Sequence, residues 1–185
     1  MRLRVTSVAL MSCLVASGAL AQSPGRSCAR VEVSSGLTAT RGTGSLVSPG
    51  SRPTVVGGSP RFSVTKVLDL TFTVLFPAKT DGEHLVELRV FTPDAQLYRS
   101  LAMPVAGRGR ALGTRSVDGY ARPLPQQAFA RVARGRGFFA AASTTFPVAG
   151  TDIVSSGLYG RWRVEAYLDG AEQRCAPAAW FALNP

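Results

Sequence analysis

The single histidine of the chain, His84, is the only side chain that could serve as the base of a nucleophilic triad. It follows the turn signal Asp81-Gly82, and Glu83 lies directly beside it. Adjacent residues of a strand point to opposite faces, so Glu83 cannot easily orient the imidazole ring. We therefore expect His84 to be a surface residue at the start of a strand, and we expect no catalytic residue in this chain.

Other patterns that could carry chemistry are weak. Residues 81–84 could offer oxygen ligands to a cation, but they lack the spaced carboxylates of a calcium loop. The glycines of residues 107–113 do not match the dinucleotide-binding fingerprint, and the other carboxylates are scattered singly. The sequence thus predicts a protein that is not an enzyme and that holds no cofactor or metal. A hydrolase with an unrecognised site is the least favoured alternative.

The most unusual stretch is residues 107–136, called here the Arg-rich connection, which holds seven arginines and one acid, Asp118. Two interpretations remain open. The arginines either keep a solvated connection soluble or converge to bind an anion such as a lipid headgroup, an acidic polysaccharide or an acidic protein. The candidate anion-binding residues are Arg108, Arg110, Arg115, Arg122, Arg131, Arg134 and Arg136.

A short helix is predicted inside this connection, over residues 125–135. Pro125 suits the first helical position, Phe129 and Val132 would share one face, and Gly135 would end the helix. Arg131 and Arg134 would then lie near its C-terminus, where the helix dipole favours cations.

Residues 1–21 have the parts of a secretory signal peptide. Arg2 and Arg4 are followed by an apolar stretch and an Ala19-Leu20-Ala21 site, so we expect cleavage before Gln22 and an exported protein in the periplasm or outside the cell. The alternatives are an uncleaved membrane anchor and a lipoprotein with its lipid on Cys13. Cleavage leaves 19 basic and 11 acidic residues, a net charge of +8.

The mature chain then holds two cysteines, Cys28 and Cys175, near its opposite ends. In an oxidising compartment such a pair predicts a disulfide that ties the N-terminal segment to the last hairpin. Two unpaired buried thiols are the alternative. A zinc site is less favoured still, because two cysteines and one histidine at unrelated spacings form no zinc pattern.

The elements that must position these residues are strands, because apolar side chains recur with a period of two. In residues 157–170, Trp162, Val164, Ala166 and Leu168 alternate with polar side chains. Arg163 and Glu165 are expected to form a solvated pair on the exposed face. About seven short strands separated by turn signals predict an all-β sandwich. The predicted strands cover residues 30–34, 62–76, 84–92, 97–105, 138–148, 157–170 and 178–183.

Leu68, Leu70, Phe72, Val74 and Phe76 are assigned to one face of the 62–76 strand. Trp162 and Trp180 are expected to pack in the core or at an edge, with an exposed aromatic platform as the alternative.

Residues 34–60 hold 15 Ser, Gly or Pro among 27 positions, which predicts a long surface loop or a loosely held edge. The expected organisation is therefore a signal peptide over residues 1–21, an N-terminal strand and Gly/Ser/Pro-rich segment over 22–60, and a sandwich body over 61–185.

The stretches "FTVLFPAKTDGEHLVELRVFTPDAQLYRSL" and "FPVAGTDIVSSGLYGRWRVEAYLDG" resemble bacterial immunoglobulin-like or fibronectin-like domains of secreted and envelope proteins. The penultimate strand of such domains often opens with a Gly-x-Trp or Gly-x-Tyr step, as Gly160-Arg161-Trp162 does here. The cysteines, which are 147 residues apart, depart from the antibody pattern. The resemblance implies a sandwich and carries no activity with it.

The sequence therefore predicts an exported, non-catalytic immunoglobulin-like module that binds or scaffolds another envelope or extracellular component. The partner would be a protein or an anionic envelope component, reached through a sheet edge or through the Arg-rich connection. Anion binding by that connection is the alternative function, and nucleic acid is the anion least expected of an exported protein.

Overall fold

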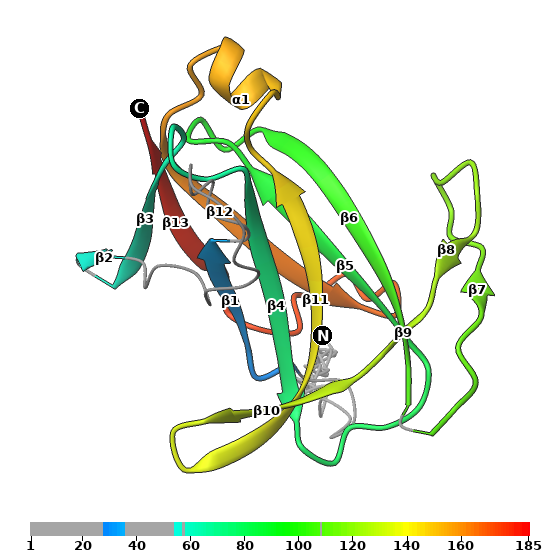
Figure 1. Cartoon of the computed structure of the whole chain (residues 1–185). Helices are drawn as coiled ribbons and strands as arrows, with labels where there is room; N and C mark the ends of the chain where they lie inside the picture. The colour runs from blue at the N-terminus through cyan, green and yellow to red at the C-terminus, as the bar shows by residue number, and fades with distance from the viewer. Residues whose placement is uncertain (1–27, 36–53, 57, 108) are drawn as a thin grey trace, which may run out of the picture.

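The computed structural model of the protein describes residues 28–35, 54–56, 58–107 and 109–185 (Figure 1). The predicted signal peptide, its cleavage site and Cys13 lie outside these residues, as do Arg108 and most of the 34–60 segment. The described part is almost entirely β, and its one helix is α1 (Asp152–Ser155). No helix in that part is long and apolar enough to cross a membrane.

One face of the molecule is a four-stranded antiparallel sheet in the order β1-β4-β11-β10. Its strands are β1 (Arg30–Ser35), β4 (Asp69–Pro77), β11 (Gly137–Pro147) and β10 (Ala130–Arg134).

The other face is a seven-stranded mixed sheet in the order β2-β3-β13-β12-β5-β6-β9. The strands are β2 (Thr54–Val56), β3 (Ser59–Ser63), β13 (Ala179–Asn184), β12 (Gly160–Leu168), β5 (His84–Phe91), β6 (Leu97–Ala106) and β9 (Gln127–Ala128). The pairs β3–β13 and β6–β9 are parallel. A separate pair, β7 (Thr114–Arg115) with β8 (Leu124–Pro125), completes the fold. The all-β sandwich is confirmed, with several short strands beyond the seven predicted.

The core lies between the two curled sheets and is rich in aromatic rings. Phe72 and Phe146 come from the four-stranded sheet, Trp162 and Phe181 come from the seven-stranded sheet, and all four are fully buried. The ring centroids of Phe72 and Phe181 are 5.7 Å apart, so the sheets interlock directly. Each of these side chains occupies an alternate position of its strand, which is why a period of two predicted the core face.

The single strand predicted over residues 62–76 is wrong, because two strands of different sheets occupy this range. β3 ends at Ser63, and a turn follows in which the N–H groups of Lys66 and Val67 both donate to the Ser63 carbonyl. β4 begins only at Asp69. Leu68 therefore lies in the connection with 42% of its surface exposed, instead of on the core face.

The predicted disulfide between Cys28 and Cys175 is confirmed, with the two Cα atoms 5.0 Å apart. The Cys28 N–H also donates to the Cys175 carbonyl, and the Cys175 N–H donates to the carbonyl of Ala166 in β12. These bonds hold the β12–β13 loop beside the second half of β12. They also anchor Cys28, just before the start of β1, to this loop.

Turn chemistry accounts for two of the predicted reversals. Asp169 and Gly170, at the end of β12, both have positive φ angles, 53° and 72°, as the Asp-Gly signal predicts. Between β5 and β6, the Ala95 N–H donates to the Thr92 carbonyl, which closes the turn that Pro93 begins.

Candidate functional site

The structure divides the Arg-rich connection into two parts that lie on different sides of the molecule (Figure 1). The first part, residues 109–126, carries β7 and β8 and stands beside β6; it is called the arm. The second part is the β10–β11 hairpin, which projects at the end of the sandwich opposite α1. Arg110, Arg115 and Arg122 belong to the arm, and Arg131, Arg134 and Arg136 belong to the hairpin. The six candidate arginines that the structure describes therefore do not converge into one cluster.

The helix predicted over residues 125–135 is wrong, because this range forms β9 and β10. β10 pairs with β11 in register, from Ala130 opposite Ala141 to Arg134 opposite Gly137. Phe129, between the two strands, is buried, and its ring centroid lies 5.1 Å from that of Phe76. Pairing with a neighbouring strand and burial of one aromatic ring outweigh a weak local helix preference.

The hairpin gathers cations around aromatic rings. The Arg131 guanidinium lies 4.1 Å from the ring centroid of Phe138, a distance typical of a cation–π contact. Phe138 nevertheless leaves 52% of its surface exposed. Arg134 Nε donates to Glu32 Oε2 at 2.9 Å, and Arg30 also pairs with Glu32. Arg136 is exposed at the turn.

The arm presents its arginines separately. Arg110 lies 3.8 Å from Glu83, a loose ion pair between two exposed side chains. Arg122 is exposed and Arg115 is half-buried, and within the described residues neither forms an ion pair. Contacts of this kind contribute less than about 1 kcal/mol, so the arginines do not hold the arm in place.

A tyrosine in the arm touches the outer edge of the seven-stranded sheet. The Ala102 N–H of β6 donates to the Tyr120 hydroxyl at 2.8 Å, and that hydroxyl donates to the Ser100 carbonyl at 3.3 Å. The Tyr120 hydroxyl thus makes two hydrogen bonds with the edge of β6. A residue opposite Leu101 on a parallel neighbouring strand would bond to the same two groups. Tyr120 was not singled out from the sequence, although the preceding Asp118-Gly119 turn signal marks the loop tip.

The part of β6 next to this contact already has a parallel neighbour. Val105 and Ala106 pair with Gln127 and Ala128 of β9. Pro104, which has no N–H, lies between the two contacts, and proline in a sheet is typical of an edge strand. The edge of β6 from Leu97 to Ala102 therefore remains open apart from the Tyr120 hydroxyl, within the described part of the chain.

His84 begins β5 as predicted, and its side chain is half-buried, with 14% exposed, instead of lying fully at the surface. Its Nδ1 lies 2.9 Å from Asp169 Oδ2, and its Nε2 lies 3.0 Å from the Asp81 carbonyl oxygen. Asp169 also accepts the Leu85 N–H, so the turn after β12 closes over the start of β5. No local signal reveals this partner, which is 85 residues away. Glu83 faces Arg110 instead.

Arg163 and Glu165 lie close together as predicted, but the prediction that the pair is solvated is wrong. Arg163 Nε lies 3.3 Å from Glu165 Oε1 without hydrogen-bond alignment, and Glu165 is only 8% exposed. The Tyr167 hydroxyl donates to Glu165 at 2.7 Å, and Arg174 donates to it from the β12–β13 loop. Burial raises the pKa of Tyr167, and the bond to Glu165 raises it further. The β12–β13 loop, which the disulfide anchors, thus covers Glu165, a residue that the sequence pattern predicts on the exposed face.

Guanidinium groups stack on aromatic rings beside this network. Arg163 lies 4.4 Å from the ring centroid of Phe91, and Arg89 lies 4.2 Å from that of Tyr167. Trp180 stacks with Arg161 at 4.3 Å and is 37% exposed. Trp162 lies in the core as predicted, whereas Trp180 packs at the surface of the sheet.

No group of three or more His, Cys, Asp or Glu side chains within the described residues is placed to hold a metal ion. No known family model matches the chain. A search of curated proteins also found no match.

Proposed function

We propose that the chain is an exported, non-catalytic immunoglobulin-like module that binds another envelope or extracellular component along the outer edge of β6. Three features support this function: the signal-peptide pattern of residues 1–21, the all-β sandwich and the open edge strand. His84 offers little support for an enzyme, since an oxygen atom already faces each of its ring nitrogens.

The observation that carries the proposal is the contact between Tyr120 and β6. The Ser100 carbonyl and the Ala102 N–H are correctly spaced to pair with a neighbouring strand, yet both bond to one side-chain hydroxyl. An extended segment of a partner can supply the same two bonds from its main chain and add further bonds toward Leu97. Strand addition of this kind needs no pocket, because the main chain of the edge strand makes the bonds.

A cross-linking experiment tests this function. A photoreactive amino acid replaces exposed Arg99 on β6 in the protein expressed in its native cells, and the control carries the same group at exposed Val154 of α1. We expect a discrete cross-linked partner from position 99 only. Ala102→Pro removes the edge N–H and should abolish that product without lowering the melting temperature strongly. Equal products from both positions, or a product that survives Ala102→Pro, would contradict edge docking.

Anion binding by the Arg-rich connection is a second candidate function. The observation that favours it is the β10–β11 hairpin, where Arg131 and Arg136 remain exposed and contact no carboxylate within the described residues. The arm contributes less to such a surface, because it lies on another side of the molecule.

A further inference from the structure

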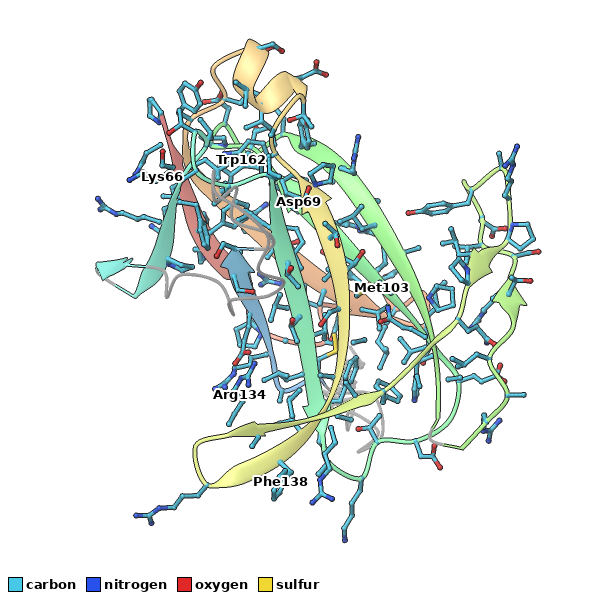
Figure 2. All side chains as sticks on the ribbon, in the orientation of Figure 1. Lys66, Asp69, Met103, Arg134, Phe138 and Trp162 are labelled. Carbon is cyan, nitrogen blue, oxygen red and sulfur yellow. A yellow bond between two sulfur atoms is a disulfide. The ribbon has the colours of Figure 1, made fainter. Side chains whose placement is uncertain are left out.

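The tip of the β10–β11 hairpin combines an uncovered aromatic ring with several cations. Phe138 is exposed to 52%, whereas the next residue of β11, Phe139, is half-buried. Figure 2 labels Phe138 and Arg134 on this hairpin, at the end of the molecule away from α1. Apart from its contact with Arg131, much of the ring faces solvent, where a partner outside the chain can reach it.

The β10–β11 hairpin and the nearby start of β1 carry several arginines. These arginines are Arg30 on β1 and Arg131, Arg134 and Arg136 on the hairpin. Among the residues that the structure describes, Glu32 is the one carboxylate that pairs with any of them. Glu32 binds two of the four cations, Arg30 and Arg134. Arg131 and Arg136 are therefore free to bind an anion, within the described residues.

The geometry of the hairpin places the apolar and the cationic groups together. The guanidinium of Arg131 lies over the ring of Phe138, so an anion that binds Arg131 also approaches the ring. An aromatic ring and an arginine side by side suit the boundary of a phospholipid bilayer, where the ring enters the acyl boundary and the cation meets the phosphates. A soluble polyanion would satisfy the arginines but would leave an apolar ring uncovered.

We propose that the hairpin tip docks on the surface of an anionic phospholipid bilayer, with Phe138 in the interface and Arg131 and Arg136 on lipid phosphates. This inference rests on the second candidate function, anion binding. It uses a surface separate from the edge of β6, so either proposal can fail while the other stands.

Vesicle co-sedimentation tests the proposal with the mature chain. Vesicles of phosphatidylcholine mixed with phosphatidylglycerol are compared with vesicles of phosphatidylcholine alone. We expect binding to the anionic vesicles only. Arg131→Gln with Arg136→Gln should weaken it roughly 25-fold, since each arginine near an anionic surface contributes about a factor of five. Phe138→Ser should weaken it about tenfold through loss of buried apolar area.

Matched variants keep the test specific to the hairpin. Arg110→Gln with Arg122→Gln removes equal charge from the arm, and Leu97→Ser removes an equally exposed apolar side chain from β6. Both should bind the anionic vesicles like the unmodified chain.

Three results would overturn lipid docking. The first is equal binding to both kinds of vesicle, and the second is equal weakening by the arm variant and the hairpin variant. The third is binding to a polyphosphate or an oligonucleotide that is as tight as vesicle binding and insensitive to Phe138→Ser, which would assign the arginines to a soluble polyanion. None of these outcomes changes the cross-linking result expected at β6.

Discussion

The two parts of the Arg-rich connection share a composition but relate to the sandwich in opposite ways. In the arm, a neutral residue, Tyr120, makes the contact with the body, while the arginines form at most a loose ion pair. In the hairpin the arginines themselves make the contacts, by stacking on Phe138 and by pairing with Glu32. A count of charges therefore does not separate a solvated segment from a built surface.

Backbone pairing explains the difference. β7 and β8 are two residues each, and among the described strands each pairs only with the other. Few backbone hydrogen bonds therefore join the arm to the body. β10 is five residues long and continues the four-stranded sheet through β11. A ladder of that length fixes the direction of alternate side chains, and Arg131 is consequently held next to Phe138.

The largest expected effect concerns the residue that joins the two parts. Phe129→Ala should destabilise the fold by about 3–5 kcal/mol, because it removes a buried ring packed against Phe76. Chemical denaturation measures the loss. Phe138→Ala is the matched control and should change the free energy of unfolding by less than about 0.5 kcal/mol. Equal losses would mean that Phe129 does not anchor the connection to the core.

The next effect concerns the place where the connection leaves β6. A Cβ atom at Gly107 would collide with the Asp81 carboxylate and lie 2.8 Å from the backbone nitrogen of Gly82. We expect Gly107→Ala to destabilise the protein by about 1–3 kcal/mol, measured by thermal unfolding. Gly109→Ala is less crowded, since nothing lies within 4 Å of its Cβ position, but its φ of 73° adds strain. An unchanged melting temperature for Gly107→Ala would show that the arm moves aside freely.

A smaller effect is expected from the contact that distinguishes the arm. Tyr120→Phe removes both hydrogen bonds to β6 and should reduce stability by about 0.5–1.5 kcal/mol. It should also speed tryptic cleavage at Arg110 and Arg122, because the arm loses its tie to the sheet. Tyr159→Phe, whose hydroxyl bonds near α1, should leave that cleavage rate unchanged. Equal rates in both variants would remove the special role given to Tyr120.

The smallest expected effect on stability distinguishes an arginine of the hairpin, which has an ion-pair partner, from an arginine of the arm. Arg134→Gln breaks the pair with Glu32 and should reduce stability by less than about 1 kcal/mol, with a smaller loss at high salt. Arg122→Gln should have no measurable effect on the melting temperature at either salt concentration. A larger loss from Arg122→Gln would reverse the proposed contrast between arm and hairpin.

Long strands were predictable from the sequence because one face of each is buried. The period of two located β1, β5, β6, β11, β12 and β13, and the turn signal Asp169-Gly170 marked the end of β12. The disulfide was predictable because only two cysteines follow the signal-peptide pattern. The same rule failed over residues 62–76, because alternation continues through a turn in which Leu68 is exposed.

The candidate surfaces were less predictable, because they depend on contacts between distant segments. Strands of two residues such as β7 and β9 have no periodicity to detect. The contact of Tyr120 with β6, the enclosure of Glu165 by Arg174 and the pairing of His84 with Asp169 each follow from the folded arrangement. The local sequence of residues 125–135 favours a helix, and the strand β10 forms there because it pairs with β11.

The position of β13 also determines when the sheet can close during synthesis. β13 is the last strand of the sequence, yet it lies between β3 and β12. At about 5–20 residues per second, β3 would be made roughly 6–23 seconds before β13. Until then β3 and β12 each lack a neighbour, and the seven-stranded sheet exists as two unjoined parts. A nascent chain that stops before Ala179 would therefore carry two unpaired edges, a pattern that favours aggregation and recognition by chaperones.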